Sequence, residues 1–285
     1  MQRIKFVFTF LIIELIVCAF SAKATVELTT EEYNNLNKLF SPGKIASLTD
    51  DEIEYYLSLD LSKTNLVQKY YKVKKTTNGL VYQEVDAAEA ENAFEKTING
   101  YTSKEGTTRY TNYNDMGYRH ISISATPTGV TNKYYITVYN QWLSEPTVKS
   151  YDVIGTRLVN ATYTEGSITG KQSYYIPSYG SYQYVNYSYN GTNIVKYSKG
   201  FGISMNLVDA ATLFANDIDY IATATANGSK AYGAYTHAVN NVTLALSQSY
   251  TIAATGYGNV IAFTSGAMNY YAGYPGVYIT MPYSS

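Results

Sequence analysis

Residues 110–285 alternate between short β-prone runs and brief turn-forming segments, and this rhythm constrains the fold more than any other feature. The runs are rich in Tyr, Val, Ile and Thr, and pairs such as Asn190-Gly191 and Asn227-Gly228 separate them. Expected strands are 119–125, 133–142, 149–159, 182–189, 193–198, 203–208, 219–226, 231–238, 242–253, 259–264 and 277–282. Short strands at this spacing predict a mainly β fold, with an antiparallel β-sandwich or jelly-roll-like body. Residues 209–218 are ambiguous, because an aspartate and several alanines would also suit a short helix.

Helix-starting signals mark the region that precedes this β body. Thr29 and Thr49 each stand three positions before a glutamate, which is the spacing of a capping box. The acidic residues that follow each threonine also suit the positive end of a helix dipole. The pattern predicts helices over 30–40 and 50–58, joined by a turn at 41–43, as an αα-hairpin.

A β-hairpin and a further helix are expected next. Residues 66–74 alternate between apolar and polar side chains, and Asn78-Gly79 joins them to a second β-prone run at 80–85. An alanine-rich segment then predicts a helix from 87 to about 98, with Gly100 as its stop. We therefore expect an N-terminal α+β subdomain over 25–105 and an antiparallel β domain over 106–285.

The first 24 residues have the features of a secretory signal peptide. Two basic residues precede the apolar run 6–20, and Ala22-Lys23-Ala24 forms an A-x-A cleavage pattern. The run is shorter than the ~20 apolar residues that span a bilayer, and Glu14 interrupts it. An uncleaved anchor and lipidation at Cys18 are the alternatives. We predict a secreted, extracellular or cell-surface protein with no membrane span after cleavage.

Cleavage would leave 18 basic and 21 acidic side chains, a formal net charge of −3, because Arg3, Lys5, Glu14 and Lys23 are removed. This charge gives no electrostatic footprint for nucleic acid or for an anionic membrane surface. The chain's one cysteine is removed as well, so the mature protein must be stabilised by its core without disulfides.

Tyrosine is concentrated in the β region. Of 33 tyrosines, 26 lie in residues 110–285, together with only seven acidic and eight basic side chains. Neighbours in a strand point to opposite faces. We therefore expect a doublet such as Tyr134-Tyr135 to place one ring in the core and the other at the surface. The run Tyr182, Tyr184, Tyr187 and Tyr189 distributes rings to both faces in the same way, and we predict it as a candidate ligand surface. The alternative is that tyrosine serves here only as a strand former.

Side chains for catalysis or metal binding form no recognisable motif. His120 and His237 lie in predicted strands without cysteine or histidine neighbours, and no G-x-S-x-G elbow supplies a nucleophile. Ser41-Pro42-Gly43-Lys44 matches S-x-x-K, but S-D-N and K-T-G are absent, and the proline and glycine are expected to prevent a helix there. We interpret the segment as a turn and predict no catalytic residue, cofactor site or metal site.

Carboxylates offer one enzymatic alternative. A glycan-active hydrolase needs two carboxyl groups roughly 5–10 Å apart in a cleft. The β region supplies seven: Asp115, Glu145, Asp152, Glu165, Asp209, Asp217 and Asp219. Asp217-Ile218-Asp219 resembles part of a calcium loop, but the further ligands do not follow, so we interpret it as a turn or strand start.

Two stretches resemble a known group of proteins. LTTEEYNNLNKLFSPGKIASLTDDEIEYYLSLDL (28–61), and the combination of KSYDVIG (149–155) with SYNGTNIVKYSKGFGISMNLVD (188–209), resemble uncharacterised secreted proteins of low-GC Gram-positive bacteria. The resemblance implies export and the two-part layout, and it assigns no active residue.

These features together predict a non-enzymatic binding protein outside the cell, with a glycan, the cell wall or another protein as partner. A glycan-active hydrolase and a self-associating structural surface protein are the alternatives.

Overall fold

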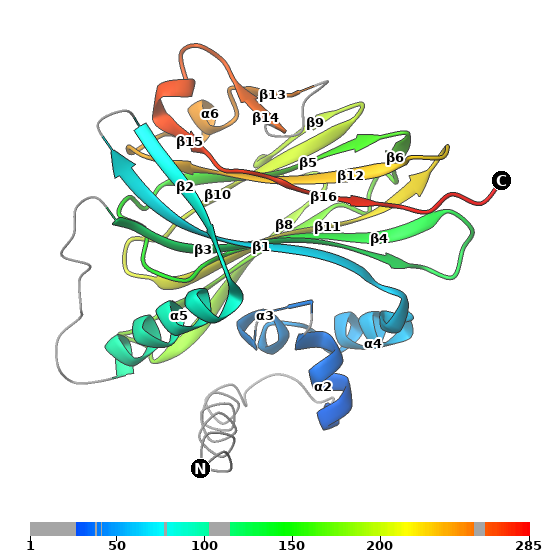
Figure 1. Ribbon diagram of the computed structural model, residues 1–285, viewed down its shortest axis with the longest axis horizontal. Helices are drawn as coiled ribbons and strands as arrows, with labels where there is room; N and C mark the ends of the chain where they lie inside the picture. Colours follow the sequence, from blue (N-terminus) through cyan, green and yellow to red (C-terminus); the bar gives the residue numbers. More distant parts are fainter. Residues whose placement is uncertain (1–26, 38, 41, 77–78, 103–114, 254–259) are drawn as a thin grey trace.

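The protein is mainly β, as predicted, and its strands pair antiparallel in two stacked sheets (Figure 1). The computed structural model describes residues 27–285 except 38, 41, 77–78, 103–114 and 254–259, so the predicted signal peptide lies outside the described residues. The larger sheet has the order β2-β1-β3-β4-β11-β7-β8, with β6 also paired to β11. Its strands are β1 (Asn65–Thr76), β2 (Gly79–Val85), β3 (Asp115–Pro127), β4 (Lys133–Trp142), β6 (Ala161–Tyr163), β7 (Thr169–Ile176), β8 (Ser181–Ser188) and β11 (Thr212–Ala224).

The smaller sheet has the order β15-β12-β5-β10-β9, with β16 also paired to β12. Its strands are β5 (Tyr151–Val159), β9 (Ile194–Tyr197), β10 (Gly200–Asn206), β12 (Lys230–Ala238), β15 (Tyr271–Gly273) and β16 (Val277–Thr280). A separate pair, β13 (Tyr250–Ile252) with β14 (Ile261–Phe263), supplies Tyr250 and Ile261 to a cluster that includes Val153 of β5.

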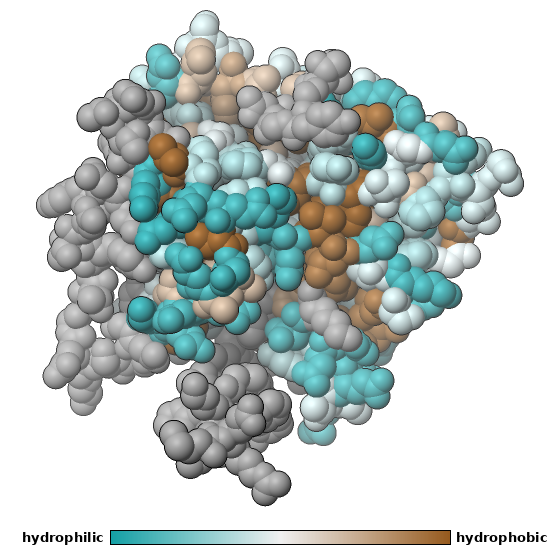
Figure 2. All heavy atoms as spheres, in the orientation of Figure 1, coloured by the Kyte–Doolittle hydropathy of each residue, from teal (hydrophilic) through white to brown (hydrophobic). Residues whose placement is uncertain are grey.

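The main core lies between the two sheets. Alternate residues of the larger sheet point inward, among them Ile123, Val138 and Ile218, and they meet Phe201 and Ile203 of the smaller sheet. All five side chains are fully buried. Along the side seen in Figure 2, hydrophobic atoms gather in a strip near the middle, where Figure 1 draws β16 and β1, which contact each other.

Helices cover the outer face of the larger sheet (Figure 1). They are α2 (Thr30–Asn37), α3 (Pro42–Ala46), α4 (Asp50–Ser58) and α5 (Ala87–Thr102), and the 3₁₀ turn η1 (Leu61–Lys63) leads into β1. Leu36, Ile53 and Tyr56 form a second small core, against which Tyr135 of β4 packs. α5 lies against β1 and β3. Within the described residues, none of the helices is both long and apolar enough to cross a bilayer.

The predicted capping box at Thr49 is confirmed. The Thr49 hydroxyl accepts from the Glu52 amide at 3.2 Å, and the Glu52 carboxylate accepts from the Thr49 amide at 2.7 Å. Together these contacts satisfy two backbone donors at the start of α4.

Two predictions about the helical region are wrong. Residues 42 and 43 do not form a turn but begin α3, since proline suits the first helical position, where its missing N–H is not needed. The helix predicted to stop at Gly100 continues to Thr102. The αα-hairpin therefore contains an additional short helix that carries Lys44.

Several strands differ from the predictions. β7 and β15 were not expected, and residues 212–218 of the ambiguous segment 209–218 belong to β11 rather than to a helix. The predicted strand 242–253 instead contains α6 (Leu244–Ser247), which Thr243 caps by accepting from the Leu246 amide at 3.2 Å. The 3₁₀ turn η2 (Met268–Tyr270) precedes β15.

Candidate functional site

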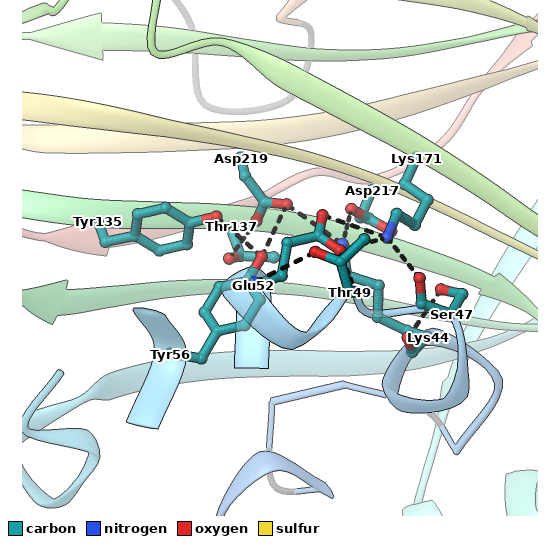
Figure 3. Close-up of polar contacts among 10 residues, drawn as sticks. All are labelled: Lys44, Ser47, Thr49, Glu52, Tyr56, Tyr135, Thr137, Lys171, Asp217 and Asp219. Carbon is teal, nitrogen blue, oxygen red and sulfur yellow. Dashed lines mark hydrogen bonds and ion pairs between the residues drawn. The ribbon is translucent and has the colours of Figure 1, made fainter. Parts of the chain in front are cut away.

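Five charged side chains meet where α3 and α4 cover the outer face of the larger sheet (Figure 3). We call this group the charged cluster; it consists of Lys44, Glu52, Lys171, Asp217 and Asp219. Asp217 and Asp219 stand two apart on β11 and so point to the same side of the sheet. Asp217 is also the direct cross-strand partner of Lys171 on β7.

Lys44 binds both aspartates of the cluster. Its Nζ contacts Asp217 Oδ1 and lies 3.2 Å from Asp219 Oδ2. The exposed side-chain fractions are 1% for Lys44, 0% for Asp217 and 4% for Asp219, so water does not reach these groups appreciably. One cation therefore serves two buried carboxyl groups.

Neighbouring side chains hold the cluster in place. Thr137 donates its hydroxyl to Asp219 Oδ1 at 2.6 Å, and the hydroxyls of Tyr56 and Tyr135 lie 3.0 Å apart beside it. Lys171 Nζ donates to the Ser47 carbonyl at 2.9 Å and to Glu52 Oε2 at 3.0 Å. Contacts from four elements of the fold thus fix the geometry.

Burial and charge shift the pKa values inside the cluster. Burial raises the pKa of Asp217 to about 7, against the opposing attraction of Lys44. Burial lowers the pKa of Lys44, but attraction to Asp217 and Asp219 outweighs it and holds this pKa well above its usual value. The pKa of Lys171 is lowered by burial and by repulsion from Lys44. Near neutral pH, Asp217 is therefore partly protonated.

Asp217 and Asp219 are a carboxyl pair that the structure brings together, but they do not fit a glycan-active hydrolase. Both are buried beneath helices and bound to Lys44, whereas a hydrolase needs its carboxyls in an open cleft. Glu145, Glu165 and Asp209 are exposed, and Asp152 is buried between the sheets. The interpretation of Asp217-Ile218-Asp219 as a turn or strand start is wrong, since all three lie within β11.

A second polar group lies inside the sandwich, formed by Trp142, Asp152, Tyr235 and His237. Asp152 accepts from the Tyr235 hydroxyl and from the Ala238 amide at 2.8 Å, and His237 Nδ1 lies 3.0 Å from both of its carboxylate oxygens. Trp142 Nε1 donates to the Tyr235 hydroxyl at 2.9 Å. Asp152 and His237 are both 0% exposed, so this acid–histidine pair is placed for packing rather than for substrate contact.

His120 is also a packed histidine. Its ring stacks on Tyr70, with centroids 4.5 Å apart and an interplanar angle of 14°. Burial, with a contribution from Arg119, lowers the pKa of His120 from 6.5 to about 4. No described residue hydrogen-bonds to the buried Nε2 atom.

This shift predicts a pH dependence of stability. The unfolded chain binds a proton at His120 below pH 6.5 and the folded chain does not, so stability falls as the pH falls from 6.5 towards about 4. The contribution is about 3 kcal/mol over that window. We expect His120→Gln to remove this pH-dependent contribution. The measurement is the free energy of unfolding in urea as a function of pH, for wild type and variant. Parallel pH profiles of the two proteins would contradict the assignment of the contribution to His120.

The predicted tyrosine run divides between the two faces of β8. Tyr182 and Tyr184 lie opposite Tyr175 and Ser173 of β7 and share the outer face with the charged cluster. Tyr187 and Tyr189 are half-buried and pack against the sandwich core. We call Tyr175, Tyr182 and Tyr184 the tyrosine surface; the Tyr175 and Tyr182 centroids are 5.3 Å apart, and Tyr184 is 41% exposed.

For Tyr134-Tyr135, the expectation that one ring of each doublet lies at the surface is met only in part, because Tyr135 is half-buried. Tyr134 is buried in the sandwich core, and Tyr135 points to the opposite face, as predicted. There, however, α4 covers it, with the Tyr56 and Tyr135 centroids 5.5 Å apart. The helices therefore partly bury a ring that strand alternation alone would leave at the surface.

The charged cluster was missed at the sequence level, although Lys44 and both aspartates were noted separately. Lys44 lies 173 positions before Asp217, so only the completed fold brings them together. Among the described side chains, no group of three or more His, Cys, Asp and Glu could hold a metal ion.

No protein-family model matches the chain, and no curated protein does. Among solved structures, the pilus backbone protein of Streptococcus pneumoniae aligns with 40% of this chain and 44% of its own, at 11% identity and a TM-score of 0.26. TmCBM61, solved in complex with β-1,4-galactotriose, aligns with 57% of this chain and 80% of its own, at 8% identity and a TM-score of 0.19. The chain thus spans less than half of the pilus structure, and both similarities are too low to bear on function.

Proposed function

We propose that the protein is a non-enzymatic binding protein outside the cell, and that it binds glycan through the tyrosine surface. The observation that carries this proposal is the position of Tyr184, a residue that is 41% exposed and lies on the outer face of the β7–β8 pair. An exposed aromatic ring offers an apolar face for stacking and a hydroxyl for hydrogen bonding, which together suit a sugar ring. The signal-peptide features of residues 1–24 support export.

The neighbours of Tyr184 favour a preformed site. Lys171 Nζ lies 5.4 Å from the centroid of its ring, and Lys171 is itself held by Glu52 and the Ser47 carbonyl. A fixed cation next to the ring restricts its movement, which lowers the entropy lost on binding. Asn186 is exposed on the same face and supplies amide donor and acceptor groups.

Tyr184→Ala is expected to weaken glycan binding about 5–30-fold, which corresponds to the loss of about 1–2 kcal/mol of aromatic contact. The measurement is glycan-array screening of the mature chain, followed by titration of the bound glycan. Tyr278→Ala is the matched control, because Tyr278 is 43% exposed, lies on β16 of the other sheet, and has Lys230 Nζ 5.0 Å from its ring centroid.

Equal loss of affinity in both variants would contradict the tyrosine surface as the binding site. A parallel pull-down with purified cell wall tests the wall as the source of the glycan. Binding to neither, with sedimentation that depends on concentration, would favour self-association instead. β8 suits that alternative, because it ends the larger sheet and has no charged side chain to discourage strand pairing.

A further inference from the structure

The charged cluster contains an amine and a carboxyl group in direct contact and away from water. Lys44 Nζ contacts Asp217 Oδ1, and the two side chains are 1% and 0% exposed. Packing holds them from both sides, because α3 carries Lys44 and the central strand β11 carries Asp217. Such fixed geometry raises the effective concentration of two reacting groups by many orders of magnitude.

A general base stands next to the amine. Asp219 Oδ2 lies 3.2 Å from Lys44 Nζ, within the distance at which a carboxylate takes a proton from a hydrogen-bonded donor. Thr137 and Tyr56 fix the orientation of this carboxyl group, at 2.6 Å from Asp219 Oδ1 and 3.5 Å from Asp219 Oδ2. Asp219 can thus remove the proton that prevents the Lys44 ammonium from acting as a nucleophile.

An ion pair alone leaves this site incompletely satisfied. Asp217 Oδ2 is buried, and no described residue hydrogen-bonds to it. A buried carboxylate oxygen without a hydrogen-bond partner destabilises the fold. Removing the two opposite charges of an ion pair from water destabilises it as well. Conversion of the two groups to a neutral amide removes both charges and one of the two oxygens.

We propose that Lys44 and Asp217 are joined by an intramolecular isopeptide bond that the folded protein forms itself. Lys44 Nζ attacks Asp217 Cγ, the new C–N bond forms, and one Cγ–O bond breaks. Asp219 takes two protons from Nζ, one after the other, and passes both to the departing oxygen, which leaves as water. Ammonium and carboxylate thus yield amide and water, and the atoms and charges balance without a further reactant.

Burial favours this product. Water is largely excluded from Lys44, Asp217 and Asp219, so the reverse hydrolysis lacks its reactant. The raised pKa of Asp217 also favours the reaction, because a protonated carboxyl group loses water more readily than a carboxylate. The proposal does not depend on glycan binding, since neither Lys44 nor Asp217 belongs to the tyrosine surface.

Intact-mass spectrometry of the folded wild-type protein tests the bond directly. The expected mass is that of the sequence minus one water molecule, and proteolysis should release a branched peptide that contains both Lys44 and Asp217. A folded wild-type protein with the full sequence mass would overturn the proposal, and so would a water loss located elsewhere.

Asp219→Asn tests the role of the base. Asparagine keeps the shape of the side chain but cannot accept the proton, so bond formation should slow by about 10²–10⁴-fold. Circular dichroism establishes that the variant is folded, and Asp60→Asn, at an exposed ion pair with Lys63, is the matched control that should lose water like wild type. Equal and complete water loss in Asp219→Asn would overturn the assignment of Asp219.

Discussion

Lys44→Met is expected to lower the free energy of unfolding by about 3–5 kcal/mol, because it leaves Asp217 and Asp219 buried without their cation. Methionine preserves much of the apolar length of the lysine side chain, so loss of charge rather than loss of volume dominates. The loss should be greatest above neutral pH and smaller near pH 5, since Asp217, whose pKa burial raises, can then become neutral. Urea unfolding at both pH values measures it.

Lys63→Met is the matched control for this substitution. Lys63 also pairs with an aspartate, Asp60, at 2.8 Å, but its side chain is 71% exposed. Solvent screens such a pair, so the unfolding midpoint should stay within experimental error of wild type. A Lys44→Met midpoint equal to that of Lys63→Met would show that the buried contact contributes nothing. If the isopeptide bond is present, Lys44→Met also opens the loop it closes, and the loss increases.

Asp152→Ala is expected to cost about 3–5 kcal/mol as well, for a different reason. It leaves the Ala238 amide, the Tyr235 hydroxyl and the His237 ring without their shared acceptor inside the sandwich. Each buried donor that loses its partner costs about 1–3 kcal/mol. Asp152→Asn should cost less, because the amide oxygen can still accept from the Ala238 amide.

Thermal and urea unfolding of both Asp152 variants measure this effect. Asp209→Ala is the control, because Asp209 is an exposed aspartate of the same domain, and its substitution should leave stability close to wild type. An Asp152→Ala variant as stable as Asp209→Ala would mean that the three donors find other partners. It would refute the prediction that the Asp152 carboxylate stabilises the fold.

Local patterns were sufficient to predict much of the fold. The β-prone run 133–142 between turn-forming segments predicted β4 with its observed bounds, and the capping box at Thr49 predicted the start of α4. β7 was missed because Lys171 and Gln172 are buried there, although such residues usually mark exposed positions. Their burial depends on partners from α4 and β11, which no window around residue 171 contains.

The candidate sites show the same limit. Tyr182 and Tyr184 were singled out from spacing alone, and strand alternation correctly separated them from Tyr187. The charged cluster could not be foreseen, because it requires the register of β11 against β7 and the position of α3 on the sheet. Pro42 obscured this further, since it was taken as a helix breaker where it begins the helix that carries Lys44.

The place of β11 in the larger sheet has a consequence for the time at which the protein can fold. β11 lies between β4 and β7, although both strands precede it in the chain. Until residues 212–224 have been synthesised, β4 and β7 each lack a neighbour, and the sheet stays in two parts. Non-local pairing of this kind slows folding. A chain that has to cross a membrane in the unfolded state would thereby stay unfolded until most of its length has been made.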